Sequence, residues 1–159
     1  MDQASPALRT KSKRQRLDDS AVTEIIGYRL RRAQVSVFQE FMARFADYEM
    51  RPSEYSVMAL IARNPGSKQI EIAKALGIKR ANFVALINSL AARGLVDRRQ
   101  PANDRRSHAL FLTPEGQDMM TSLDAVQARF EADCVARLGG PEARQQLIDL
   151  LARLTIGTP

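Results

Sequence analysis

Residues 94–116 read GLVDRRQPANDRRSHALFLTPEG, and this stretch decides the fold. It contains LVDRR at 95–99, then the polar run PANDRRS, then HALFLT at 108–113. Leu110 and Leu112 fall on one face of an extended chain, because successive strand residues point to opposite sides. The pattern predicts two strands joined by a charged loop of about seven residues, which suits a protruding wing better than a tight hairpin turn.

The residues after the second strand predict two long helices. Thr113-Pro114-Glu115 offers a capping hydroxyl, a proline for the first turn and an acid for the helix dipole. The helical spacing of apolar residues then continues to about Leu138, where Gly139-Gly140-Pro141 breaks the chain. The last helix is markedly apolar on account of Leu147, Ile148, Leu150, Leu151 and Leu154.

The segment before the strands has the spacing of a helix-turn-helix. Residues 69–88 read QIEIAKALGIKRANFVALIN, with the small Ala73 at the helix crossing and Gly77 at the turn. Ser67 is positioned to cap the first of these helices, and Gly94 to end the second. An ordinary αα-corner needs the same small residue and glycine, so this motif alone leaves both interpretations open. A strand, a basic loop and a second strand after it favour a winged helix.

Two further helices are predicted towards the N-terminus. One runs from residues 19–21 to just before Pro52, with an apolar stripe so broad that it must be covered from more than one side. The other runs from Pro52 to about Arg63 and ends at Asn64-Pro65-Gly66. The predicted fold is therefore mainly α, with a winged helix-turn-helix at 52–113, a helix at 18–51, helices at 114–159 and a basic disordered tail at 1–17.

The excess of positive charge is concentrated in two blocks. The chain of 159 residues has 24 Lys and Arg against 18 Asp and Glu, a net charge of +6. Residues 1–16 hold five basic residues against one acid, and residues 79–106 hold seven against two. Such blocks indicate a polyanionic partner, although a basic tail also serves simply as a solvated terminus.

The scarcity of certain residues excludes several classes of protein. One cysteine, Cys134, rules out an internal disulfide and favours the reducing cytoplasm. One histidine, His108, leaves no ligand set for structural zinc, and no apolar run is long enough for a membrane span. No catalytic constellation or phosphate-binding glycine loop is present, so we expect neither an enzyme, a metal nor a cofactor. Cys134 is expected to pack in the interior.

The stretch 94–116 resembles the wing of the MarR family of transcriptional regulators, which shows a GLV-x-R strand, a D-x-R turn and an LT-x-x-G close. The similarity extends over about residues 20–155. It implies an obligate homodimer with intertwined first and last helices, which binds a pseudo-palindromic operator and is usually a repressor released by a small aromatic ligand. It also implies that Arg106 inserts into the DNA minor groove and that Asp104 orients it, while Arg105 is expected to meet phosphate.

Further DNA contacts are predicted on the second helix of the helix-turn-helix. Lys79, Arg80, Asn82 and Asn88 point away from the face that holds Phe83, which we assign to the core. Arginine pairs with guanine and asparagine with adenine in the major groove. Arg98 belongs to the same basic block and completes the predicted DNA-binding residues.

The effector pocket of this family lies between the dimer helices and the winged domain. Tyr28, Arg29 and Arg32 on the first helix, with Met58 on the second, are candidates for binding an aromatic acid or an aryl-coenzyme A thioester, which suggests a role in aromatic catabolism. The opposing interpretation is that Tyr28 is dimer core and the arginines are surface. The alternative function is a nucleic-acid architectural protein without sequence preference.

Overall fold

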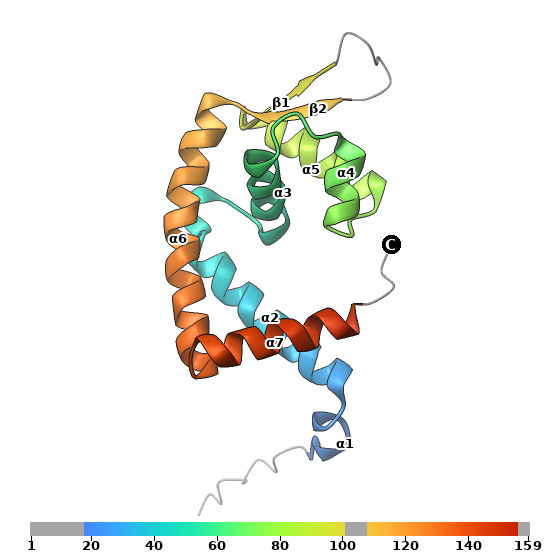
Figure 1. The fold of residues 1–159 in the computed structure, drawn as a ribbon, viewed down its shortest axis with the longest axis vertical. Coiled ribbons are helices and arrows are strands. Elements are labelled where there is room, and N and C mark those ends of the chain that lie inside the picture. The colour runs from blue at the N-terminus through green and yellow to red at the C-terminus, as the bar shows by residue number, and fades with distance from the viewer. Residues whose placement is uncertain (1–17, 101–107, 156–159) are drawn as a thin grey trace, which may run out of the picture. The chain divides into compact units, whose positions relative to one another are not determined.

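The computed structural model describes residues 18–100 and 108–155, which form a mainly helical fold with one small sheet (Figure 1). The chain divides into two compact units, Met1–Ser36 and Val37–Pro159. In order, the elements are α1 (Ser20–Thr23), α2 (Ile26–Arg44), the 3-10 helix η1 (Ala46–Tyr48), α3 (Pro52–Arg63), α4 (Gln69–Ala75), α5 (Arg80–Ala92), β1 (Val96–Arg99), β2 (Ala109–Leu112), α6 (Pro114–Leu138) and α7 (Pro141–Leu154). The basic tail and the wing tip, residues 101–107, lie outside the described residues.

The prediction of one continuous helix before Pro52 was wrong. The chain leaves the helical path between α1 and α2, where β-branched Thr23, Ile25 and Ile26 disfavour the helix. The Arg29 guanidinium donates to the Thr23 carbonyl that the break leaves without a helical partner. At the other end α2 stops at Arg44, and η1 follows it.

The chain reverses direction after η1, at a residue with left-handed backbone. Glu49 has φ +48°, and the next residue, Met50, is 1% exposed in the core. Pro52 disfavours helical backbone at the residue before it, and Arg51 is extended. The turn therefore brings Met50 inside, which a continuous helix would not do.

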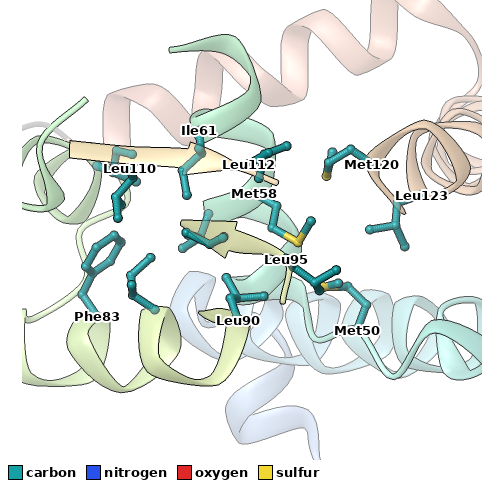
Figure 2. Close-up of a cluster of buried hydrophobic side chains, with 14 of the residues drawn as sticks. Met50, Met58, Ile61, Phe83, Leu90, Leu95, Leu110, Leu112, Met120 and Leu123 are labelled. Atoms are coloured by element: carbon teal, nitrogen blue, oxygen red, sulfur yellow. The ribbon is translucent and has the colours of Figure 1, made fainter. Parts of the chain in front are cut away.

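The winged helix-turn-helix surrounds a single hydrophobic core. Phe83 and Leu90 of α5 face Met58 and Ile61 of α3 (Figure 2). The two strands close this core from the side of Leu95, Leu110 and Leu112, and α6 contributes Met120 and Leu123 (Figure 2). Phe83 is 1% exposed, which confirms its assignment to the core.

The sheet and the start of α6 are as the sequence predicts. The strands are antiparallel, with Val96 opposite Leu112 and Arg99 opposite Ala109. The Thr113 hydroxyl caps α6 by accepting from the Gly116 backbone N–H at 2.9 Å, and it donates to the Gly94 carbonyl at 2.6 Å. Gly77 and Gly94 have φ +62° and +69°, which confirms their left-handed roles.

The N-cap of α4 differs from the prediction by one residue. The cap position is Lys68 and not Ser67, and the Lys68 backbone N–H donates to the Glu71 carboxylate at 2.8 Å. The Ser67 carbonyl instead accepts from the Leu110 N–H at 3.0 Å, and the Gly66 N–H donates to the Leu110 carbonyl at 2.8 Å. These backbone bonds hold residues 66 and 67 beside β2, so the helix starts later.

Polar contacts fasten α6 to α2 and α3. Arg137 donates to Glu40 at 2.6 Å, and Arg44 pairs with Asp133 at 2.8 Å. The hydrogen bond from Arg137 holds the pKa of the Glu40 carboxyl below its ordinary value. Cys134 is partly buried against the core and accepts from Arg137 at 3.2 Å, which agrees with a packing role.

The second unit leaves a large apolar surface exposed on α7. Leu150 and Leu154 are 55% and 58% exposed, and Leu147, Ile148 and Leu151 are also exposed. Burial of such side chains is worth roughly 1.5–3 kcal/mol each, so a helix with five exposed is expected to have a partner surface. None of the helices in the described ranges is sufficiently long and apolar to traverse a lipid bilayer.

Candidate nucleic-acid interface

Helix α5 presents a polar row to solvent because its other face is fixed in the core. Phe83, Ile87 and Leu90 are all buried. Lys79 is the N-cap and Arg80 the first residue of the helix, and both are exposed, as is Asn82. Three of the predicted DNA-binding side chains therefore lie together at the N-terminal end of α5, where a helix inserted in the major groove contacts base edges.

A cavity of about 250 Å³ lies beside this end of α5. Its basic lining comes from three separate places in the chain: Lys68 before α4, Arg80 on α5 and His108 before β2. Gln69 and Phe83 are also among its lining residues. Three basic side chains and an amide around one hollow suit a phosphate group, since anions bind where N–H donors and positive charge converge.

Asn88 and Arg98 form a pair rather than two independent contacts. The Arg98 Nη2 donates to the Asn88 Oδ1 at 2.7 Å, which ties β1 to α5. Both residues are exposed. The neighbouring Arg99 lies over the Phe111 ring, 4.4 Å from its centroid, and donates to Asp97 at 2.9 Å, so this guanidinium is held at the base of the wing.

The predicted wing-tip residues Asp104, Arg105 and Arg106 lie outside the described residues. Arg99 and Ala109 are the last paired residues, and residue 68 bridges to Ala109 as well.

Two adjoining grooves lie on another side of α3. One, of about 490 Å³, is lined by Phe38 and Met42 of α2, by Leu76 and Ile78 of the helix-turn-helix turn, and by Arg51, Pro52, Ser53 and Ser56 at the start of α3. The other, also about 490 Å³, shares Arg51, Ser53 and Ile78 and adds Glu54 with Asn82, Ala85, Leu86 and Ser89 of α5. The shared residues place the two grooves side by side.

The residues predicted to bind an effector are not those that line these grooves. Met58 is completely buried in the core and lines neither groove. Tyr28, Arg29 and Arg32 belong to the first unit, where Arg29 pairs with Glu24 at 3.6 Å. Sequence reasoning missed the grooves because their lining comes from three separate segments. Exposed Phe38 and Met42, one helical turn apart, were the available signal.

Comparison with known proteins decides the family. The profile of the MarR family matches residues 48–107. A putative transcriptional regulatory protein for the hcr operon of Thauera aromatica is 35% identical over 130 residues, which cover 81% of this chain and 78% of that protein. The chain belongs to the MarR family.

Solved structures of a MarR-family protein resemble this regulator over most of its length. The transcriptional repressor CouR bound to a 23-mer DNA duplex has a TM-score of 0.82 and 38% identity, with 88% of this chain and 99% of CouR covered. CouR bound to p-coumaroyl-CoA has a TM-score of 0.81 and 35% identity, with 89% and 99% covered. These matches confirm the winged helix-turn-helix fold that the wing motif predicted.

Proposed function

We propose that this MarR-family regulator is a homodimeric repressor that binds a pseudo-palindromic operator and is released by an aryl-coenzyme A thioester or a related aromatic acid. The observation that carries the proposal is the likeness to CouR, because that repressor has been solved with both a DNA duplex and p-coumaroyl-CoA. The chain acts by binding rather than by catalysis, and it works in the cytoplasm.

The proposed DNA interface has three parts. Lys79, Arg80 and Asn82 enter the major groove, and the basic cavity between α4 and α5 receives a backbone phosphate. Asn88 acts together with Arg98, because the hydrogen bond that Arg98 donates orients the Asn88 amide. The third part is the wing tip, where Arg106 enters the minor groove beside Asp104, and Arg105 meets phosphate.

The proposed effector site is the pair of grooves at the start of α3. Phe38, Met42 and Ile78 offer an apolar surface to an aromatic acyl group. Arg51 lines both grooves and supplies a positive charge for a phosphate or carboxylate of the ligand. The sequence-based prediction of Tyr28, Arg29, Arg32 and Met58 stays a second proposal for the effector site.

Dimerisation is proposed to bury the apolar face of α7. A homodimer presents two α5 helices to two half-sites, so the operator should contain an inverted repeat with half-sites about one DNA turn apart. A protein without sequence preference, the alternative function, would bind any duplex equally. Fluorescence anisotropy at ~0.15 M salt distinguishes them, because a specific operator should bind on the order of 10³-fold more tightly than random duplex.

Lys79→Ala is expected to weaken binding to operator and random DNA by similar factors, because a lysine at the N-cap of α5 reaches phosphates. Loss of one phosphate contact should reduce the slope of log K against log salt by about one. The measurement is a salt titration of DNA affinity. Arg129→Ala is the control, since it removes one exposed positive charge from α6. A loss confined to one base position would contradict the phosphate assignment.

Arg51→Ala is expected to weaken thioester binding about tenfold, because loss of one exposed charge-assisted hydrogen bond reduces the binding free energy by about 1.4 kcal/mol. Isothermal calorimetry with p-coumaroyl-CoA measures the effect. Arg63→Ala is the matched control, because Arg63 is an exposed arginine at the other end of α3 and lines neither groove. Equal affinity of Arg51→Ala and Arg63→Ala would remove Arg51 from the effector site.

A further inference from the structure

Glu54 is the one charged residue that is buried within the described part of the chain, with 6% of its surface exposed. A buried carboxylate is costly unless donors or positive charges surround it, and Glu54 has two hydrogen-bond donors and one cationic partner. The Arg51 backbone N–H donates at 3.0 Å, the Ser89 hydroxyl donates at 3.2 Å, and Arg93 Nη1 lies 3.8 Å away. Arg51 is the N-cap of α3, Ser89 lies near the C-terminal end of α5, and Arg93 is the C-cap of α5.

Arg93 extends the connection to the chain reversal before α3. Its guanidinium donates to the Tyr48 carbonyl at 2.9 Å and to the Glu49 carbonyl at 3.2 Å. Glu49 is the residue with the left-handed backbone. The C-terminal end of α5, the helix proposed to contact DNA bases, is therefore connected through Glu54 and Arg93 to the segment that joins α2 to α3.

The same carboxylate borders the proposed effector site. Glu54 and Ser89 both line the second groove, and Arg51 lines both grooves. A ligand bound in the second groove therefore lies against the Ser89–Glu54 hydrogen bond. The groove, the buried carboxylate and the recognition helix are thus in direct contact.

We infer that Glu54 is a positioning residue that transmits occupancy of the groove to helix α5, an inference that rests on the proposed function. In the ligand-free protein, the hydrogen bond from Ser89 and the ion pair with Arg93 set the orientation of α5 relative to α3. A ligand in the groove displaces the Ser89 hydroxyl from the carboxylate and allows α5 to shift. The ligand binds the two orientations of α5 with different affinity. Ligand binding therefore favours one orientation and DNA binding the other, so the two oppose each other.

The experiment compares the operator affinity of each protein with and without saturating p-coumaroyl-CoA. The ratio of the two dissociation constants is the coupling factor, expected to be on the order of 10–100 for the wild type. Glu54→Gln keeps the size of the side chain but loses its charge, and Ser89→Ala removes one hydrogen bond. Both are expected to reduce the factor to about 2.

Ser122→Ala is the matched control. Ser122 lies on α6 and lines neither groove, and its hydroxyl donates to the Asp118 carbonyl at 3.4 Å. It should keep the wild-type coupling factor. Thermal melts accompany each variant, and Ser89→Ala, with its exposed position, tests the inference even if Glu54→Gln is destabilised.

Two outcomes distinguish failure of the Glu54 coupling role from failure of the proposed repressor function. A wild-type coupling factor retained by both Glu54→Gln and Ser89→Ala refutes the role of Glu54 and leaves the proposed function intact. A wild-type protein whose operator binding does not respond to p-coumaroyl-CoA or to aromatic acids refutes the proposed effector response, and the coupling role with it.

Discussion

Gly116→Ala is expected to destabilise the protein by about 3 kcal/mol, because overpacking a rigid site typically costs 1–3 kcal/mol and this contact is with backbone. A Cβ on Gly116 would lie 2.1 Å from the Leu95 carbonyl oxygen and 3.0 Å from the Leu95 carbonyl carbon. The Leu95 carbonyl cannot easily retreat, since it accepts from the Thr113 N–H at 3.2 Å, and the Leu95 N–H donates to Leu90 at 3.0 Å.

The expected decrease in Tm is about 10 °C, since 1 kcal/mol shifts Tm by roughly 2–4 °C in a chain of this size. Differential scanning fluorimetry at one fixed protein concentration measures it. Gly27→Ala is the control. Gly27 lies in α2, and a Cβ there would meet nothing within 4 Å, so the alanine should be neutral or slightly stabilising. Equal Tm values for the two variants would disprove the close approach of α6 to residue 95.

Leu150→Glu is expected to prevent dimerisation and to lower operator affinity by on the order of 10³-fold, because only a dimer contacts both half-sites. Leu150 is 55% exposed on the apolar face of α7. In a symmetric interface each substitution appears twice, and each unpaired buried charge costs several kcal/mol. The monomer should keep its fold, since Leu150 belongs to no buried cluster of the single chain.

Analytical ultracentrifugation checks the dimer, and anisotropy with the operator duplex checks the affinity. Gln145→Glu is the matched control, since it adds the same charge to the polar side of the exposed helix, where Gln145 donates to Asp149 at 2.9 Å. It should remain dimeric and bind DNA as the wild type does. If Leu150→Glu sediments as a dimer, the apolar face of α7 is not the interface.

Local signals in the sequence predicted most of the winged helix-turn-helix. Gly77 and Gly94 were placed correctly because left-handed backbone strongly selects glycine. The helix start at Thr113 was placed correctly because a hydroxyl followed by proline satisfies backbone groups within one turn. Phe83 was assigned to the core from helical periodicity, which depends only on neighbours along the same helix.

The errors arose where a distant segment competes with a local signal. Ser67 resembles an N-cap, but its carbonyl is taken by Leu110, and the helix begins after Lys68. The apolar pattern before Pro52 indicated one continuous helix. In the structure α2 ends at Arg44, and the chain after it turns so that Met50 is buried. The residues of one helix alone do not reveal the contact with Leu110 or the core that surrounds Met50.

The sequence by itself determined the order of the elements, the wing and the apolar faces, because caps, turns and periodicity act over a few residues. Only the tertiary structure decided what lies between those elements. In that structure Met58 is buried in the core, and Phe38 and Ser89 line two adjoining grooves. The Glu54 carboxylate lies between the Arg51 backbone N–H and the Arg93 guanidinium. An apolar face specifies that a residue is covered, but the covering neighbour comes from a segment folded back from elsewhere in the chain.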